Sequence, residues 1–510
     1  MDQGNGAHLK DCDTTPTIAI LGAGFSGLGM AIRLREEGID TFTIYEKADE
    51  VGGTWRENTY PGVACDVPSH LYSFSFEPNP NWSQRFSPGD EIWDYARHCA
   101  KKYDLYRSIQ FGKKVTTISH DGAKWRVAFA DGSSIKADYV VSGLGGLHEP
   151  SFPDIEGRDS FAGPAFHTAQ WRHDVDLTGK RVAIIGSAAS AVQVIPEIVD
   201  KVAHLDVYQR TPNWVMPRHS YHYPKWVKAL FAKAPKLARL YRGMYFTLME
   251  QRFGAFKKND NAVKRHVRRL FTKHLERQVR DPDLRARLTP DYPIGCKRIL
   301  ISDDYLGAIQ KDNVDLVTDP IDAITDGGVR TKDGRVREVD ILIYATGFRP
   351  FDILTTLEVT GPDGRSLKDV WKDGIAAHRT LAVPGFPNFF ILLGPNSALG
   401  HNSVLLMIEA QVNYIIKLMN EACAAGARFL APKPEAASAF DESIQRDLQG
   451  RVWAANCGAW YVDAQGRNYT LYPHAVRRYL RDMREPALDE YVLTSGMADA
   501  QPQETASSAT

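Results

Sequence analysis

Three glycines near the start of the chain have the spacing of a loop that holds a phosphate. Gly22, Gly24 and Gly27 follow the apolar run 18–21 and precede residues with helical spacing. The first glycine allows a tight turn, the second lets the backbone approach a pyrophosphate, and the third lets the helix pack on the strand. Glu46 ends the next apolar run, 19 residues after Gly27, where a carboxylate accepts hydrogen bonds from ribose hydroxyls. The pattern predicts a site for a dinucleotide with a free ribose, such as FAD.

A second unit of the same design follows later in the chain. The apolar run 182–185 leads into GSAASA, from Gly186 to Ala191, with alanine at the second and third glycine positions. Arg210 lies 19 residues after Ala191, at the offset that Glu46 has in the first unit. A guanidinium at this position attracts a 2′-phosphate, whereas a carboxylate repels it. We therefore predict that the second site binds NADPH rather than NADH, and a surface ion pair is the alternative role of Arg210.

Two dinucleotide sites in one chain imply that hydride passes from NADPH to a flavin. Disulfide reductases send the electrons on to a C-x-x-C or similar pair. The chain has six scattered cysteines and no such pair: Cys12, Cys65, Cys99, Cys296, Cys423 and Cys457. Dioxygen is then the leading electron acceptor, as in a monooxygenase or an oxidase. Because the scatter fits neither a zinc site nor a disulfide scaffold, we expect no metal and a reducing, cytoplasmic location.

The elements around these loops alternate in the manner of an α/β protein. Apolar runs rich in Val and Ile alternate with helical stretches, which predicts two Rossmann-like dinucleotide-binding domains with a helical insertion. Both domains are expected to be discontinuous: FAD-binding at 16–148 and 380–494, NADPH-binding at 149–218 and 290–379, with the insertion at 219–289. The ends are polar, and we expect a flexible leader at 1–15 and a disordered tail at 495–510.

The composition excludes several classes of protein. The chain has 62 Lys and Arg against 62 Asp and Glu, and a nucleic-acid binder usually needs a broad basic face. No run of about 18 uninterrupted apolar residues is present, so no transmembrane segment is expected. A hydrophobic fraction of 43% supplies large buried cores and excludes general disorder.

Residues 161–171 carry a longer motif. They read FAGPAFHTAQW, with Phe161, Gly163, His167 and Trp171 in the pattern F-x-G-x-x-x-H-x-x-x-W. This pattern resembles the fingerprint of the type I Baeyer–Villiger monooxygenases, which are class B flavin-dependent monooxygenases. The family usually has Pro or Asp next, where this chain has an arginine. The resemblance covers about residues 15–490 and includes further stretches: GGTW at 52–55, N-x-YPG at 58–62, QRTP at 209–212, KR at 297–298, ATG at 345–347 and GP at 394–395.

The resemblance implies a reaction with FAD and NADPH as cofactors. NADPH reduces the flavin, dioxygen gives a flavin peroxide, and the peroxide attacks an apolar ketone. The tetrahedral adduct then rearranges to an ester or lactone. Two alternatives stay open at this point. One is a flavin monooxygenase that oxidises sulfur, nitrogen or alkyl carbon, and the other is a non-enzymatic nucleotide-binding flavoprotein sensor.

The resemblance also implies roles for individual residues. Arg298 is the expected catalytic cation that stabilises the peroxide and adduct anions, and Asp66 orients it, although the two could form only a structural ion pair. Phe161, Gly163, His167 and Trp171 are expected to link the domains and position the cofactors. The residues expected to bind FAD are Gly22, Gly24, Ser26, Gly27, Glu46, Thr54, Trp55, Arg56, Glu57, Asp66, Tyr72 and Val115. Those expected to bind NADPH are Ser187, Ala188, Ala189, Ser190, Ala191, Val192, Gln193, Arg210, Thr211, Lys297 and Arg298.

The insertion is both aromatic and basic. Residues 257–287 hold 11 Lys and Arg against four acids. We favour a solvated helix face there; the alternative is attraction to an anionic membrane surface or to a phosphate-bearing cofactor, aided by the aromatic residues upstream. The aromatic helices either pack on one another or line a tunnel for apolar ketones. The oligomeric state and the identity of the ketone do not follow from the sequence.

Overall fold

The structure, a computed structural model, describes residue 9 and residues 15–147, 149–349, 357–455, 457–458, 461–462 and 466–496. Most of the predicted leader and tail lies outside these residues. Leu9 is an exception within the leader, because it is buried and its N–H donates to Asn420 Oδ1 at 2.9 Å.

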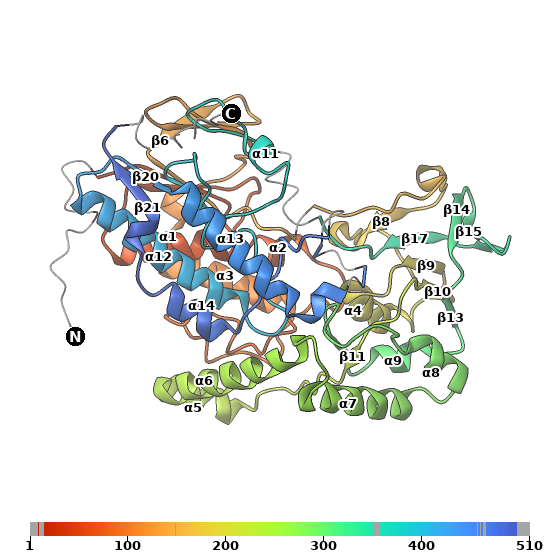
Figure 1. Ribbon diagram of the computed structural model, residues 1–510. Helices are drawn as coiled ribbons and strands as arrows, with labels where there is room; N and C mark the ends of the chain where they lie inside the picture. Colours follow the sequence, from red (N-terminus) through yellow and green to blue (C-terminus); the bar gives the residue numbers. More distant parts are fainter. Residues whose placement is uncertain are drawn as a thin grey trace, which may run out of the picture.

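Two parallel sheets, each flanked by helices, form the two halves of the molecule (Figure 1). We call them the first and the second domain. The strand that leads into each glycine loop is the central strand of its sheet and is largely buried. Parallel strands that are buried on both faces have such apolar, Val- and Ile-rich sequences. In each domain a smaller sheet packs on one of these faces. The predicted α/β class is confirmed.

The first sheet contains, within the described residues and in spatial order, β19 (Phe389–Ile391), β7 (Tyr139–Ser142), β1 (Ile18–Leu21), β2 (Phe42–Tyr45) and β3 (Ile109–Gln110). Helices of this domain include α1 (Phe25–Glu36), α2 (Thr54–Glu57), α3 (Gly89–Lys102), α12 (Val404–Ala424), α13 (Pro434–Gln449) and α14 (Val476–Asp482). The first and last thirds of the chain meet here, because α1 packs against α12 and α12 packs against α14 (Figure 1).

The second sheet contains, in spatial order, β13 (Val314–Val317), β10 (His204–Tyr208), β9 (Arg181–Ile185), β17 (Ile341–Tyr344) and β8 (Ala165–His167). All four pairings in it are parallel. Two helices, α4 (Ala189–Ile198) and α9 (Tyr305–Ile309), pack on each other beside it. The edge strand β8 carries the middle of the 161–171 motif, including His167.

Smaller sheets decorate both domains. One contains β18 (Glu358–Thr360), β4 (Val115–His120), β5 (Trp125–Phe129) and β6 (Ser134–Ala137), and another contains β14 (Ile321–Thr325), β15 (Gly328–Thr331) and β16 (Val336–Glu338). Two strand pairs are β11 (Val215–Met216) with β12 (Leu300–Ile301) and β20 (Phe429–Pro432) with β21 (Tyr491–Thr494).

The pairing of β18 moves one domain boundary. β18 lies parallel to β4, and α11 (Leu367–Val370) contributes Leu367 to the same buried cluster as Trp125. Both contacts belong to the first domain. The chain therefore returns to this domain before residue 358, earlier than the boundary expected at 380, because a strand from the return segment completes the small sheet.

The insertion consists of helices along one side of the molecule (Figure 1). They are α5 (Lys225–Lys233), α6 (Pro235–Arg252), α7 (Ala262–Gln278) and α8 (Pro282–Leu288). The guanidinium of Arg242 fastens α6 to the first domain by donating to the carbonyls of His70, Leu71 and Ser73 at 2.8–3.0 Å. None of the described helices combines the length and apolar character that crossing a bilayer requires.

The expectation that the cysteines form no disulfide is wrong for three of them. Cys296 and Cys457, which are 161 residues apart, are joined by a disulfide with a Cα–Cα distance of 6.3 Å, and Cys423 is also disulfide-bonded. Cys65 and Cys99 are free and buried. The scatter in sequence hides these pairs because folding brings distant segments together. A cytoplasmic location therefore stays a prediction that the cysteines no longer support.

Candidate active site

The first glycine loop joins β1 to the N-terminus of α1. An added Cβ at Gly27 would lie 1.9 Å from the carbonyl oxygen of Gly22, so packing of helix on strand requires glycine there. An added Cβ at Gly24 would meet only Gly53 backbone atoms, at 3.6 and 4.0 Å, which is ordinary contact. The fold itself therefore does not require a glycine at 24. Its missing side chain fits a pyrophosphate that approaches the uncapped helix N-terminus, as in dinucleotide loops.

Glu46 is held beside this loop at the end of β2. Its carboxylate is buried and accepts hydrogen bonds from the N–H groups of Ala23 at 2.7 Å and Ala48 at 3.0 Å. The Arg56 guanidinium lies 3.8 Å from it. Val115 opens β4 two residues after Lys113, whose N–H donates to the Glu46 carbonyl at 2.8 Å. The structure thus brings the predicted ribose acceptor to the glycine loop and places Val115 at the start of β4, in a smaller sheet of the same domain.

The segment after Gly53 forms the facing wall of this loop. Thr54, Trp55, Arg56 and Glu57 make up α2, and the Trp55 indole donates to the Tyr72 hydroxyl at 3.1 Å. Ser26 is buried in the first turn of α1. Apart from Val115, the residues expected to bind FAD therefore lie in the first domain between the glycine loop and Tyr72.

An ion pair between the two domains lies next to Tyr72. Arg298 donates from Nε at 3.0 Å and from Nη2 at 2.5 Å to Asp66 Oδ2. The side chains are 43% and 31% exposed, so the pair faces an open space rather than the core. Asp66 raises the pKa of Arg298, which keeps the guanidinium charged. Both bonds use the Nε–Nη2 edge of the guanidinium, so no hydrogen bond to the described residues occupies the Nη1 side, which can meet another anion.

Tyr461 belongs to this cluster and was not found from the sequence. It is buried, and burial raises the pKa of its hydroxyl to about 12 against the opposing effect of Arg298, to whose backbone it is hydrogen-bonded. No motif surrounds it in the sequence. Cys296, one residue before Lys297, ties this segment to Cys457, and the Trp453 indole donates to the Gly295 carbonyl at 3.0 Å. A C-terminal stretch of the chain therefore supports the Lys297–Arg298 pair.

The second glycine loop has the same geometry as the first. An added Cβ at Gly186 would lie 2.4 Å from the Ala345 carbonyl oxygen. The N-cap of α4 is Ala188, with no side-chain cap. Four of the residues expected to bind NADPH can offer only backbone groups or apolar surface at the start of α4: Ala188, Ala189, Ala191 and Val192. The helix N-terminus is thus available to an anion.

The polar residues around this loop also join the two domains. Gln193 accepts from the Tyr60 hydroxyl at 2.9 Å and donates to the Ala64 carbonyl at 2.9 Å. The Ser187 carbonyl accepts from the Asn213 amide at 2.9 Å, and the Ser187 hydroxyl lies 3.5 Å from the Thr211 carbonyl. Both polar ends of Gln193 are therefore used between domains, which makes it a domain contact as well as a predicted NADPH contact.

Two cations lie together near this loop. Partial burial lowers the pKa of Lys297, the charge of Arg210 adds to this effect, and Asp291 opposes it. The Lys297 ammonium also lies 4.8 Å from the centre of the Tyr292 ring. Repulsion between two nearby positive charges is reduced when an anion binds between them, and a phosphate supplies two negative charges. The pair fits the predicted 2′-phosphate of NADPH.

The 161–171 motif lies along the edge of the second sheet. His167 ends β8 opposite Tyr344, is fully buried, and accepts from the Ala169 N–H at 3.0 Å through Nδ1. Burial lowers its pKa to about 4, so the ring is neutral near pH 7. Trp171 packs edge-to-face on Phe166 at 5.2 Å. The His167 neighbour Thr168 donates to the Ser190 hydroxyl at 3.2 Å, which connects the motif to the second glycine loop.

Gly163 and Phe161 have a packing role in this motif. An added Cβ at Gly163 would lie 2.6 Å from the Asp340 carbonyl oxygen and 2.8 Å from the Phe161 ring. Neither residue approaches the Arg298–Asp66 pair through any described contact. The structure therefore positions the motif beside the second nucleotide loop rather than beside the central ion pair.

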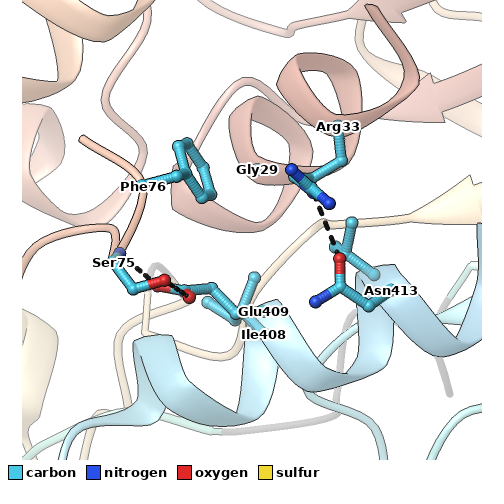
Figure 2. Close-up of a pocket in the computed structure, with 8 residues that line it drawn as sticks. Gly29, Arg33, Ser75, Phe76, Ile408, Glu409 and Asn413 are labelled. Carbon is cyan, nitrogen blue, oxygen red and sulfur yellow. Dashed lines mark hydrogen bonds between the residues drawn. The ribbon is translucent and has the colours of Figure 1, made fainter. Parts of the chain in front are cut away.

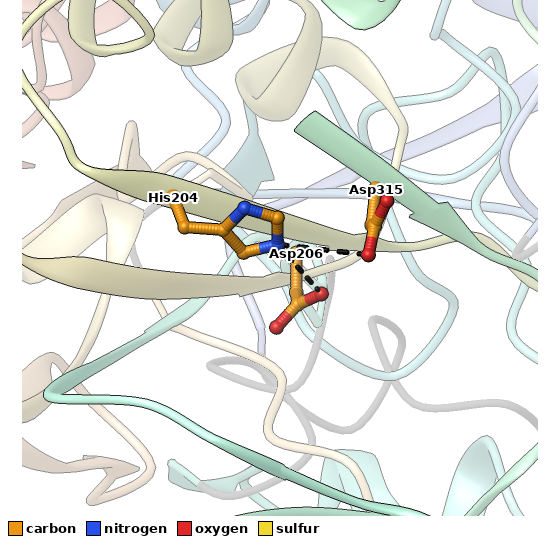
Figure 3. Close-up of side chains that lie close together, drawn as sticks. All are labelled: His204, Asp206 and Asp315. Carbon is orange, nitrogen blue, oxygen red and sulfur yellow. Dashed lines mark ion pairs between the residues drawn. The ribbon is translucent and has the colours of Figure 1, made fainter. Parts of the chain in front are cut away.

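One group of metal-binding residue types comes together among the described residues (Figure 3). His204 Nε2 lies 3.6 Å from carboxylate oxygens of both Asp206 and Asp315 on β10 and β13. The Arg337 guanidinium also lies 3.4 Å from Asp206. The Arg337 guanidinium therefore already neutralises the Asp206 carboxylate that a metal cation would need. We interpret the group as an ion-pair cluster.

A cavity between α1 and α12 does not coincide with these sites (Figure 2). Its volume of about 150 Å³ is below the 300–1,000 Å³ typical of ligand pockets. Arg33 donates to Asn413 at 3.1 Å across it, and the Ser75 N–H donates to Glu409 at 2.8 Å. None of the predicted site residues lines it. We interpret it as a gap in helix packing.

The free cysteines do not form a redox pair. Burial raises the pKa of the Cys99 thiol to about 12 and raises that of Cys65 as well, where Asp66 adds to the effect. A thiol protonated in this way is a poor nucleophile. Neither thiol is therefore suited to act as a catalytic nucleophile.

Comparisons with known proteins agree with this architecture. A family model described as pyridine nucleotide-disulphide oxidoreductase matches residues 19–269. A Baeyer-Villiger monooxygenase from Pseudomonas aeruginosa is 43% identical over 485 residues, which cover 94% of this chain and 91% of that protein. The closed crystal structure of cyclohexanone monooxygenase has a TM-score of 0.84 at 27% identity and covers 94% of this chain and 99% of its own. The structure of OTEMO in complex with FAD and NADP has a TM-score of 0.83 at 25% identity, with the same coverage.

The disulphide in the description of the family model has no counterpart in the matched segment. The described cysteines of that segment are Cys65 and Cys99, which are buried and free. The two nucleotide domains, the 161–171 motif and the match along 94% of the chain decide the family instead. The chain belongs to the Baeyer–Villiger monooxygenases, the FAD- and NADPH-dependent enzymes that insert one oxygen atom of dioxygen beside a ketone carbonyl.

Proposed function

We propose that this chain oxidises apolar ketones to esters or lactones with Arg298 as the catalytic cation. The observation that carries the proposal is the Arg298–Asp66 pair, which joins the two nucleotide domains beside Tyr72. When bound and reduced by NADPH, FAD would activate dioxygen, and one atom of that dioxygen would be inserted next to the carbonyl.

The part of Arg298 follows from its charge and its orientation. Negative charge develops on oxygen in this reaction, and a fixed cation aimed at that charge lowers the barrier. A guanidinium stays protonated at every working pH, and Asp66 strengthens that protonation. Because Asp66 holds one edge of the guanidinium, the rotation of the long side chain is restricted and the free edge has a defined direction.

Recognition of NADPH belongs to Lys297 and Arg210 in this proposal. Their charges are close enough for Arg210 to lower the pKa of Lys297, and a 2′-phosphate would relieve that repulsion. Lys297 and Arg298 are neighbours in the chain. One short segment, fastened by the Cys296–Cys457 disulfide, would therefore hold the nicotinamide cofactor and the catalytic cation together.

The substrate class is supported by the surroundings of the ion pair. The described neighbours of Arg298 and Asp66 include Tyr72 and Tyr461, whose rings are buried or partly buried and whose hydroxyls stay protonated. The Cys65 thiol also interacts with Arg298, and its raised pKa keeps it protonated as well. Such a site suits a carbonyl compound that carries little charge, and a solved structural relative is a cyclohexanone monooxygenase.

The proposal is tested by Arg298→Ala. We expect NADPH to reduce the flavin at close to the wild-type rate under anaerobic conditions, whereas ester formation from a panel of linear, cyclic and aryl ketones falls at least about 100-fold. Arg268→Ala removes an exposed arginine of α7 and serves as the matched control. If Arg298→Ala forms ester at near the wild-type rate, Arg298 is not the stabilising cation.

A further inference from the structure

Most of the large apolar side chains that are exposed in the described chain lie on the insertion. Eleven large apolar side chains are exposed, and seven of them lie between residues 221 and 248. These seven define what we call the α5–α6 surface: Tyr221, Trp226, Leu230, Leu237, Leu240, Met244 and Leu248. Trp226 and Leu240 are 69% and 70% exposed, which is unusual for side chains of this size.

The spacing on α6 places its apolar side chains on one stripe. Leu237, Leu240, Met244 and Leu248 follow one another at three- and four-residue steps, so they share one face of the helix. A different face, with Ala238, Tyr245 and Met249, is buried against the protein. One face of α6 therefore packs against the core, and the exposed stripe on another face does not contribute to this packing.

The charge of this segment has one sign. From Ser220 to Met249 the sequence contains no Asp or Glu. Lys225, Lys233, Lys236 and Arg239 are exposed, and Lys228 is partly exposed. Long basic side chains can lay their apolar stems beside an apolar stripe while their charged ends reach outward. A tryptophan and leucines bordered by lysines form the pattern of a helix that lies in a membrane interface.

The surface is held rigidly on the first domain. Arg242 bonds to three carbonyls of the 70–73 segment, and the rings of Phe231 and Tyr241 pack edge-to-face on His70. At the far end of α6, Glu250 accepts from the N–H groups of Val476 and Arg477 at 3.1 Å. A fixed pair of helices presents its apolar and basic groups together, which lowers the entropic cost of binding.

We propose that the α5–α6 surface binds the surface of an anionic lipid bilayer. Each lysine or arginine near such a surface contributes attraction, and the exposed tryptophan and leucines enter the boundary between headgroups and acyl chains. A second copy of the chain is a poorer occupant. A two-fold interface would place the cations of one α5–α6 surface against the same cations of its partner, with no acid from this segment between them.

Vesicle co-flotation of the FAD-loaded protein tests the proposal. Vesicles of phosphatidylcholine with 30% phosphatidylglycerol, used at about 50 mM salt, should bind the protein, whereas pure phosphatidylcholine vesicles should bind it much less. Trp226→Ser with Leu240→Ser should reduce the partition coefficient at least about tenfold. Lys233→Gln with Lys236→Gln should reduce it about fivefold for each charge removed, with a weaker effect at 500 mM salt.

The control changes exposed apolar residues elsewhere. Val336→Ser with Leu488→Ser removes two such side chains outside the α5–α6 surface and should leave binding unchanged. Ketone-dependent NADPH oxidation in solution reports that each variant is folded. The proposal is overturned if the wild-type protein does not float with anionic vesicles, or if the control loses as much binding as the α5–α6 variants. It is also overturned if Trp226→Ser with Leu240→Ser instead converts a dimer into a monomer in vesicle-free sedimentation.

Discussion

At the scale of the residue, the neighbouring cations Lys297 and Arg298 have different surroundings and are proposed to have different roles. Arg298 pairs with Asp66 and stays charged, whereas burial and the charge of Arg210 lower the pKa of Lys297. The sequence identified Arg298, Asp66, Lys297 and Arg210 because short motifs or a fixed offset mark them. Tyr461 carries no such mark, and only the fold brings it to Arg298.

Replacement of either cation near the second loop should change cofactor preference. Lys297→Ala and Arg210→Ala are each expected to raise KM for NADPH about 10- to 100-fold, because each loses a charge-assisted contact to the 2′-phosphate. KM for NADH should change little, because NADH lacks that phosphate. Steady-state kinetics with both cofactors check this. An equal rise in both KM values would show that the cations do not read the phosphate.

At the scale of the element, substitutions of Gly24 and Gly27 in the first loop should have different effects. Gly24→Ala is expected to fold, since its Cβ meets only ordinary contacts, but to bind FAD weakly because the methyl group blocks the pyrophosphate. Gly27→Ala is expected to fold poorly, because its Cβ would lie 1.9 Å from a carbonyl oxygen of the preceding turn. Far-ultraviolet circular dichroism and the flavin absorbance of the purified proteins distinguish the two outcomes. A yellow, fully loaded Gly24→Ala protein would contradict the assignment of the loop.

The disulfide is also an element-scale feature with a measurable effect. Cys457→Ser is expected to lower the free energy of unfolding by about 2–4 kcal/mol, because the segment around Trp453 is then no longer joined to Cys296. Its thermal unfolding midpoint should fall below that of the wild-type protein under non-reducing conditions. Peptide mapping without reductant should recover a linked pair of peptides from the wild-type chain. Recovery of both peptides as free thiols would contradict the pairing.

At the scale of the whole molecule, the features that local sequence patterns mark could be predicted, whereas the pairings between distant segments could not. Each strand–glycine–helix unit lies within about 20 residues, so the two parallel domains and their central strands follow from the sequence. The pairing of β18 with β4 and of Cys296 with Cys457 joins distant segments, and no local pattern marks either one. The helical insertion was expected, but its exposed apolar stripe was not, because exposure depends on which face the first domain covers.

Buried histidines should make the molecule sensitive to mild acid. Burial lowers the pKa of His70, His120 and His167 to about 4, below the ordinary value of 6.5. The folded state therefore binds fewer protons than the unfolded state between these values. Stability should be complete above about pH 6.5 and fall as the pH approaches 4, by about 1–3 kcal/mol for each histidine. Thermal unfolding midpoints between pH 7 and pH 4.5 measure this loss.

A pair of histidine variants separates this effect from general acid denaturation. His120→Gln should flatten the dependence of the unfolding midpoint on pH, because one buried ring no longer has to stay neutral. His266→Gln changes an exposed histidine on α7 and should leave that dependence unaltered. An unfolding midpoint that does not change between pH 7 and pH 4.5 would argue against buried neutral histidines.

The most direct test of the central claim follows the oxygen atom. The purified FAD-loaded protein is supplied with NADPH, an apolar ketone and ¹⁸O₂, and the products are examined by mass spectrometry. We expect an ester or lactone that carries one ¹⁸O atom, formed in proportion to the NADPH consumed. Consumption of NADPH with hydrogen peroxide as the only labelled product, across linear, cyclic and aryl ketones, would contradict the account.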